Sequence, residues 1–214
     1  MRRTNLLDEV RRKRGYLLSY HRLLHAIQPE LLAAYDAFYT RFTLDDDVLS
    51  PVEKETVWLA LIVATRARVG TIHLKRAVAA GMSRDAIADA LALAAACESL
   101  DAIGFARDAF PDWVDESRLV KRYVRAFEAA RGRTKPVLAE IAAAVAHAGR
   151  RNAEGQRLHL ERAFERGAKP ATVAKALSFV LLHCGGPTML AAMEVWLKMV
   201  KQGKFPSPFG AKSK

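Results

Sequence analysis

The sequence lacks several features that would identify whole classes of protein. Its 214 residues contain only two cysteines, Cys97 and Cys184, far apart and outside any Cys/His spacing typical of metal modules. Neither a disulfide framework nor a metal site is therefore expected. No apolar run reaches the roughly 18 residues of a membrane-spanning helix. The arginine-rich start is followed by no clear apolar segment and cleavage site, so the expected location is cytoplasmic.

Signatures of nucleic-acid binding are also missing, although the chain is basic. Its 34 Lys and Arg residues against 23 Asp and Glu give a formal net charge of +11. The excess gathers at residues 11–14, at residues 121–135 and in the C-terminal lysines Lys198, Lys201, Lys204, Lys212 and Lys214. Such clusters are usually solvated helix faces or tails, and no helix-turn-helix, zinc-finger or aromatic RNA-binding pattern accompanies them. Nucleic acid is therefore not the expected partner.

The composition and the pattern of apolar residues favour an all-α fold. It is 51% hydrophobic and 27% charged, as in globular proteins, and no run alternates apolar and polar residues as a half-buried strand would. Ser50, Pro51 and Glu53 predict a capped helix start, and that helix should run to about Arg68. Ser83 should cap a later helix that ends near Cys97.

Two parts of the chain repeat each other at an offset of 86 residues. His73, Leu74, Arg76, Ala77, Gly81, Ala88, Ala90 and Leu91 match His159, Leu160, Arg162, Ala163, Gly167, Ala174, Ala176 and Leu177. This density of identity predicts an internal duplication. The expected divisions are bracing helices (1–49), a first repeat (50–112), a second repeat (113–200) and a tail (201–214), with a helix break at residues 110–117.

Three features of the repeats are similar to one known family. A glutamate-bearing helix follows residues 49–55, Glu140 precedes His159 at about the family's interval, and the His-Cys-Gly-Gly-Pro of residues 183–187 stands where the family has Tyr-x-Gly-x-Pro. On these residues, 50–110 and 134–197 resemble the carboxymuconolactone decarboxylase and alkyl hydroperoxidase D-like family. The resemblance implies its helical fold and a homo-oligomer, whether dimer, trimer or hexamer.

One departure from the family separates the functions that the resemblance implies. Peroxidase members carry Cys-x-x-Cys-x-x-x-His, but those cysteine positions are Arg66 and Val69 before His73, and Asn152 and Gly155 before His159. A thiol peroxidase is therefore a minor alternative. The leading prediction is a cofactor-independent lyase (decarboxylase) or isomerase that acts on a small anionic, cyclic carboxylate or lactone. A non-enzymatic helical interaction or assembly module is the other alternative.

The predicted reaction centre lies in the second repeat. His159 is the candidate general acid or base, and Glu140 would orient its ring. His147 shares a helical face with Glu140 and would help to bind the substrate, as would His73 in the first repeat. A purely structural helix-packing role for His159 remains open.

Other polar residues are candidates for holding the substrate's charge. His183 precedes Gly185 and Gly186, whose backbone could approach a carboxylate closely. Arg66 or Arg157 could bind that carboxylate through two parallel hydrogen bonds. A salt bridge for Arg66, a simple helix break at the glycines and a buried thiol at Cys184 are the structural alternatives.

Overall fold

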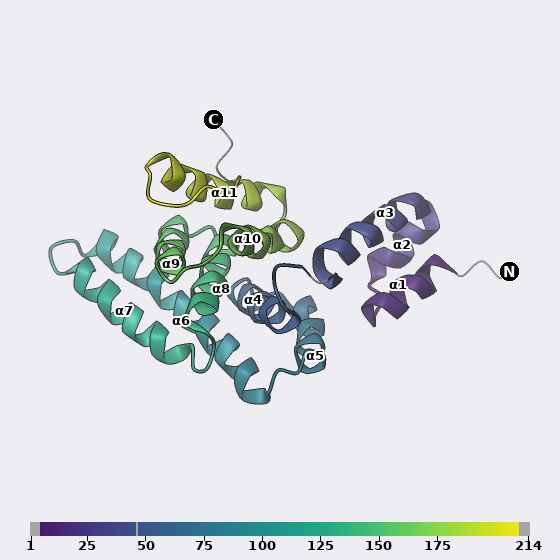
Figure 1. Ribbon diagram of the computed structural model, residues 1–214, viewed down its shortest axis with the longest axis horizontal. Helices are drawn as coiled ribbons and strands as arrows, with labels where there is room; N and C mark the ends of the chain where they lie inside the picture. The colour runs from purple at the N-terminus through teal and green to yellow at the C-terminus, as the bar shows by residue number, and fades with distance from the viewer. Residues whose placement is uncertain (1–4, 46, 210–214) are drawn as a thin grey trace. The chain divides into compact units, whose positions relative to one another are not determined.

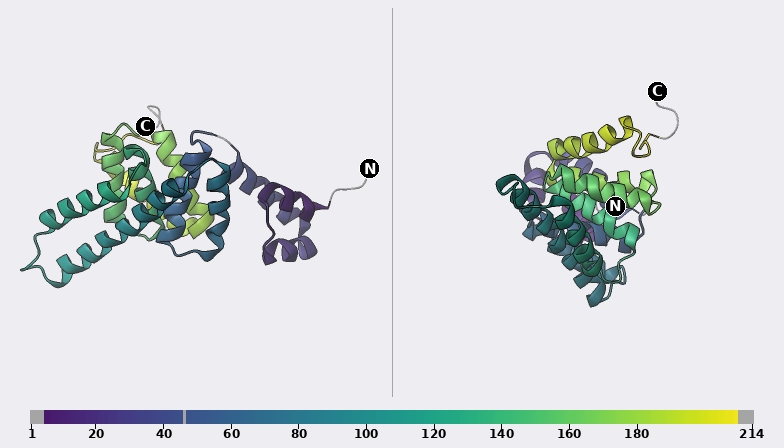
Figure 2. Two further views of the ribbon diagram at one scale, coloured as in Figure 1. Left: turned by 90° about the horizontal axis from the view of Figure 1, so that it is seen from below. Right: turned by 90° about the vertical axis from the view of Figure 1, so that its left-hand side faces the viewer.

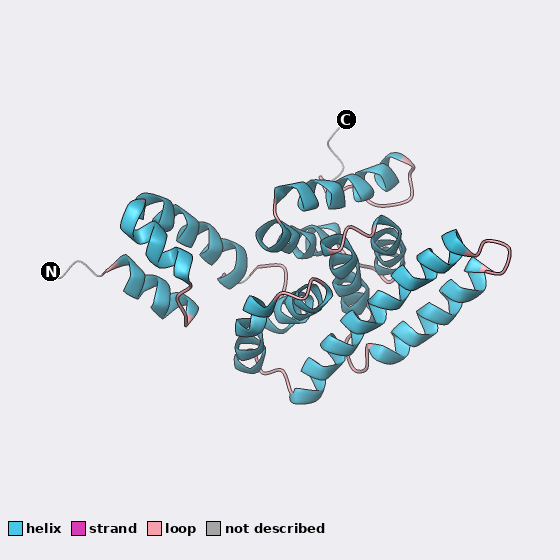
Figure 3. Ribbon diagram, turned by 180° about the vertical axis from the view of Figure 1, so that it is seen from behind, coloured by secondary structure: helices cyan, strands magenta, loops and turns pink. Residues whose placement is uncertain are grey.

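The computed structural model describes residues 5–45 and 47–209 (Figure 1). Every regular element in these two ranges is helical, which confirms the predicted all-α class (Figure 3). The α-helices are α1 (Leu6–Arg14), α2 (Ser19–Ile27), α3 (Pro29–Tyr39), α4 (Pro51–Ala64), α5 (Ile72–Ala79), α6 (Arg84–Ala109), α7 (Glu116–Ala130), α8 (Pro136–Gly149), α9 (Ala153–Glu165), α10 (Pro170–Cys184) and α11 (Gly186–Lys201). None of them is long and apolar enough to cross a membrane.

Helices α1 to α3 form one compact unit, Met1–Asp47, and the remaining helices form a second, Val48–Lys214. The first unit is organised around a buried cation. The guanidinium of Arg14 donates to Asp36 at 3.0 Å and lies 3.8 Å from the centre of the Tyr39 ring. A bracing role for this unit and the division of the rest into two repeats stay predictions.

Helix α8 is the central element of the second unit. Its residues 138–148 are all buried, and it contacts α4, α6, α9, α10 and α11 (Figure 1). A helix can be buried on every side only if it is apolar around its whole circumference, and alanine lets neighbouring backbones approach closely. Two polar side chains nevertheless lie within this buried run, Glu140 and His147.

The same order of elements occurs twice in the second unit. A proline-started helix (α4 or α8), a turn, a histidine-bearing helix (α5 or α9), a glycine turn and a further helix (α6 or α10) follow one another. Each first turn contains a non-glycine residue with positive φ, Arg66 at 55° and Arg151 at 59°. Each glycine turn also has positive φ, 90° at Gly81 and 82° at Gly167. The backbone thus follows the sequence correspondence.

Two predicted helix ends were wrong. The capping box of Ser50 and Glu53 is present, but α4 ends at Ala64, because Arg66 adopts the left-handed conformation that stops a helix. Helix α6 continues past Cys97 to Ala109, since the residues after Cys97 include no proline and only one glycine, Gly104.

The predicted break at residues 110–117 is present. Helix α6 ends at Ala109, and the Asp115 side chain caps α7 by accepting a hydrogen bond from the Arg118 amide. The two helices then pack side by side as a long hairpin (Figure 2).

The C-terminal segment after α11 is non-helical as far as residue 209. Phe205 is buried, and Trp196 Nε1 donates to the Pro206 carbonyl at 3.0 Å. The rest of the predicted tail, with Lys212 and Lys214, lies outside the described residues.

Candidate functional site

The predicted Glu140–His159 pair is formed in the interior of the second unit. Helices α8 and α9 pack together, and His159 Nδ1 donates to Glu140 Oε2 at 2.6 Å. The exposed fractions of the two side chains are 0% and 1%. The pairing fixes which ring nitrogen carries the proton and directs Nε2 away from the carboxylate.

Two arginines compensate the buried charge of Glu140. Arg162, one turn after His159 on α9, approaches Oε1 at 2.8 Å, and Arg166 approaches the same oxygen at 3.3 Å. Both arginines also pair with Glu128 of α7. The buried carboxylate thus has a histidine and two guanidinium groups as partners.

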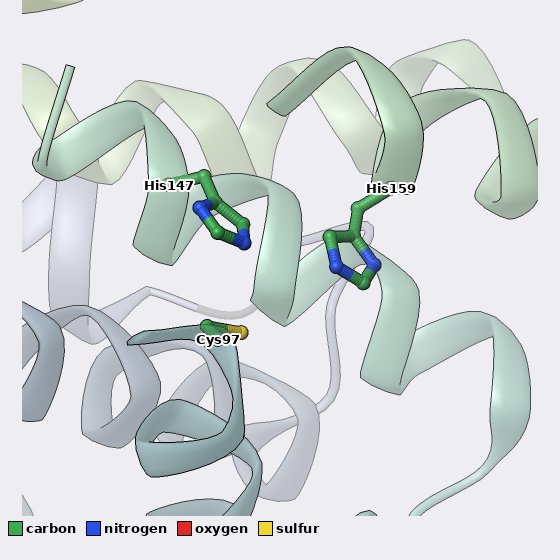
Figure 4. A group of neighbouring side chains, drawn as sticks. All are labelled: Cys97, His147 and His159. Atoms are coloured by element: carbon green, nitrogen blue, oxygen red, sulfur yellow. The ribbon is translucent and has the colours of Figure 1, made fainter. Parts of the chain in front are cut away.

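Beyond His159 lies a polar cluster formed by three other helices. The Tyr123 hydroxyl from α7 donates to His159 Nε2 at 2.5 Å and lies 3.5 Å from Nε2 of His147. The Cys97 thiol from α6 belongs to the same cluster, because one ligand atom each of Cys97, His147 and His159 lies within 4.8 Å of the others. Figure 4 shows Cys97, His147 and His159 pointing into one space from three helices. All four side chains are buried.

Burial decides the protonation states in this cluster. It lowers the pKa of His147 to about 3 and lowers the pKa of His159 despite the favourable contact with Glu140. It raises the pKa of Cys97 to about 12 and that of Tyr123 as well. At neutral pH the cluster therefore holds neutral imidazoles, a thiol and a phenol.

A second Glu–His pair lies between α4 and α5. His73 Nδ1 donates to Glu55 Oε2 at 2.8 Å, and the two side chains are each 8% exposed. The His73 ring stacks on Trp58, with 4.7 Å between centres, and Trp58 also stacks on Phe179 of α10 at 4.7 Å. Among the described residues, the His73 ring hydrogen-bonds through Nδ1 and not through Nε2. The ring is thus held at Nδ1 by Glu55 and on its face by Trp58.

His183 belongs with this first pair, which corrects its predicted place beside His159. Its Nε2 is 2.7 Å from the hydroxyl of Thr65, and its ring meets the edge of Trp58 at 6.2 Å between centres. Burial, followed by the neighbouring His73, lowers its pKa, so the ring is neutral at neutral pH. The reason is topological: α10 packs against α4 as well as α8, and its end reaches Thr65.

The two predicted carboxylate-binding arginines do not join either pair. Arg66 pairs with Glu98 at 2.8 Å and its side chain is 68% exposed. A salt bridge of Arg66 was predicted, but with Glu53, Glu55 or a second subunit as its partner. Arg157 lies two residues from His159, on another face of α9, where it lines two surface clefts of about 470 and 540 Å³.

The remaining motif residues are the glycine at the end of α10, the two cysteines and the glycine at a peroxidase cysteine position. Gly185 has φ 85° where α10 ends, which supports the helix-break interpretation. Cys97 and Cys184 are both free thiols, and Cys97 is fully buried. At Gly155, a peroxidase cysteine position, a Cβ would lie 2.6 Å from Cε1 of His147. The His147 ring therefore occupies the space that a cysteine side chain would need.

Sequence reasoning missed further residues of these sites, among them Glu55, Trp58, Thr65 and Tyr123. One of them was detectable, because Glu55 precedes His73 by 18 residues, close to the 19 between Glu140 and His159. The other three have no counterpart in the repeat pattern.

Comparisons with known proteins agree with this architecture. Residues 29–110 match the sequence profile of the Carboxymuconolactone decarboxylase family. A crystal structure described as a putative gamma-carboxymuconolactone decarboxylase subunit from Burkholderia xenovorans LB400 has the same fold, with a TM-score of 0.58 and 18% identity over 92% of this chain and 97% of that one. No curated protein matches the sequence.

Proposed function

We propose that this protein is a cofactor-independent lyase or isomerase that moves a proton on a small, cyclic carboxylate or lactone. The observation that carries the proposal is the Glu55–His73 pair. It repeats the geometry of Glu140–His159, yet its side chains are less deeply enclosed, 8% exposed against 0% and 1%. With Nδ1 bound to Glu55, Nε2 makes His73, rather than the predicted His159, the proton-transferring residue.

The proposed chemistry needs only one proton donor and a means of holding negative charge. In a decarboxylation, the bond from carbon to the carboxylate breaks, carbon dioxide leaves, and the electron pair stays on the carbon conjugated with the lactone carbonyl. Protonated His73 delivers the Nε2 proton to that carbon and regains a proton from solvent. Glu55 holds the ring orientation and stabilises its charged form.

The substrate's charge would be held from α10. Lys175, Phe179 and His183 are spaced four residues apart, so they lie along one face of that helix. The Lys175 ammonium is 5.7 Å from the centre of the Phe179 ring, which stacks on Trp58. This arrangement takes over the role predicted for Arg66 and Arg157. A homo-oligomer, as dimer, trimer or hexamer, is proposed with it.

The test uses gamma-carboxymuconolactone as the probe in deuterated buffer, with carbon dioxide release and deuterium incorporation as the two readouts. His73→Gln should lower turnover by about 10²–10⁴-fold, the usual contribution of a positioned acid or base. His159→Gln is the matched control, and circular dichroism checks the fold of both variants. Loss of turnover in His159→Gln alone would move the reaction to the second pair.

The alternatives give different results in the same assay. An interaction or assembly module would show no turnover with this lactone or with related cyclic carboxylates. A thiol peroxidase would consume peroxide through a cysteine, but burial raises the pKa of Cys97, and Cys184 is on a different helix. Peroxide turnover that is lost when both cysteines are replaced by serine would restore the peroxidase interpretation.

A further inference from the structure

We propose that Cys97, His147 and His159 form a zinc site, with the Tyr123 hydroxyl beside the fourth coordination position. The sequence gives no sign of it, because the three residues come from helices α6, α8 and α9 and follow no metal-binding spacing. It is separate from the Glu55–His73 pair and does not depend on the proposed reaction.

The donor atoms are close to the arrangement that zinc requires. One ligand atom from each residue lies within 4.8 Å of the others (Figure 4). Zinc bonds of about 2.0–2.3 Å to nitrogen and sulfur place tetrahedral ligands about 3.3–3.8 Å apart. The three donors therefore need to close by about 1 Å, which a rotation of the side chains can supply.

The surroundings of His159 are those of a zinc ligand. Its Nδ1 donates to Glu140 Oε2 at 2.6 Å, so the lone pair of Nε2 faces Cys97 and Tyr123. A carboxylate behind a histidine is the usual means of orienting a zinc-binding imidazole and raising its basicity. Arg162 holds the other oxygen of that carboxylate at 2.8 Å.

The remaining ligands have the right chemistry. Nδ1 of His147 is buried with no hydrogen-bond partner among the described residues, so nothing prevents it from carrying the proton while Nε2 binds the metal. Zinc would displace the proton of the Cys97 thiol to solvent and bind the thiolate, whose negative charge reduces that of the ion. Two nitrogens and a sulfur favour zinc over calcium or magnesium, which prefer oxygen ligands.

Burial determines how the site would be loaded and tested. All the ligands are fully buried, so the metal must enter as the chain folds or when the helices open. The full chain is therefore refolded from guanidinium with Co²⁺ as a visible substitute for Zn²⁺, and unbound metal is removed by gel filtration. Circular dichroism verifies the fold, and a parallel sample refolded with Zn²⁺ is analysed for its metal content.

The expected result is about one metal ion per chain and a thiolate-to-cobalt charge-transfer band. The two cysteines provide a matched pair: the band should disappear in Cys97→Ser and persist in Cys184→Ser. If Cys97→Ser does not refold, a band in Cys184→Ser still assigns the thiolate to Cys97, the one cysteine left. A correctly refolded wild type without the band or bound zinc would overturn the proposal, as would a band that depends on Cys184.

Discussion

Glu140 Oε2 accepts the Nδ1 proton of His159 at 2.6 Å, while Oε1 of the same carboxylate accepts from Arg162 at 2.8 Å. Both oxygens of a buried side chain are therefore used, and the negative charge faces a guanidinium on one side and an imidazole on the other. Such an arrangement is costly to break from one side, because the partners left behind are then buried without compensation.

Glu140→Gln should therefore destabilise the protein by about 3–5 kcal/mol, measured as the free energy of unfolding in urea. Glu55→Gln is the matched control, because within residues 5–45 and 47–209 the Glu55 carboxylate accepts a hydrogen bond from His73 alone. Its loss should be about 1–2 kcal/mol, as for a single buried hydrogen bond. Equal losses in the two variants would contradict the role assigned to the arginines.

Gly155 and Gly104 give opposite expectations for the same substitution. An added Cβ at Gly155 would lie 2.6 Å from two atoms of the His147 ring, whereas at Gly104 it would meet nothing within 4 Å. Gly155→Ala should lower the free energy of unfolding by about 1–3 kcal/mol through overpacking. Gly104→Ala, in the interior of α6, should raise it by about 0.5–1 kcal/mol. Chemical denaturation of both variants measures the difference, and a neutral Gly155→Ala would show that His147 can move.

Arg66 occupies a conformation that suits glycine better. Its φ of 55° costs about 1–2 kcal/mol for a residue with a Cβ, and its salt bridge with Glu98 is largely solvent-exposed. Arg66→Gly should therefore leave the midpoint of thermal unfolding unchanged or raise it. Arg66→Val, which removes the same charge but adds a β-branched side chain, should lower it. If both variants behave alike, the ion pair and not the backbone dominates at this position.

The first unit should respond to acid through His21. Burial, and next the charge of Arg14, lower the pKa of His21 to about 4, below its ordinary value of about 6.5. As pH falls below 6.5, the His21 ring becomes protonated in the unfolded chain, whereas in the folded unit it stays neutral until the pH approaches about 4. The stabilisation is complete above that pH and is lost between pH 6.5 and about 4, at up to about 1.4 kcal/mol per pH unit.

The measurement for His21 is urea unfolding at several pH values, followed by the near-ultraviolet circular dichroism of the tyrosines. Asp36 should not contribute in this window, since hydrogen bonds from Lys13 and Arg14 outweigh its burial and lower its pKa. His21→Gln should remove most of the slope between pH 6.5 and 4. A variant with the wild-type slope would assign the effect to another group.

Local signals in the sequence predicted most of the helical framework. Ser50 and Ser83 cap helices as expected, and Gly81 and Gly167 end them, because caps and left-handed turns depend on a few neighbouring residues. The predicted ends of α4 and α6 were wrong. No local sequence pattern indicates that Arg66 adopts a positive φ or that α6 continues through Gly104.

The sites were only partly predictable. The Glu140–His159 pair could be foreseen, because two residues on consecutive antiparallel helices meet when the repeat is formed. The position of His183 could not, because it depends on which helix α10 contacts in the tertiary packing. Tyr123 was missed for the same reason: α7 belongs to no repeated element, and its sequence does not indicate which helix it covers.

Helix α8 has a consequence for how this protein can vary. With every residue from 138 to 148 enclosed, and most of them alanine, side-chain volume and not polarity limits replacement there. A saturation library should accept glycine or serine at several of these positions more readily than leucine, the reverse of an ordinary hydrophobic core. Glu140 and His147 are the two positions of this run where the packing already accommodates a long polar side chain. In relatives with this packing, new activities should therefore arise from substitutions at these two positions.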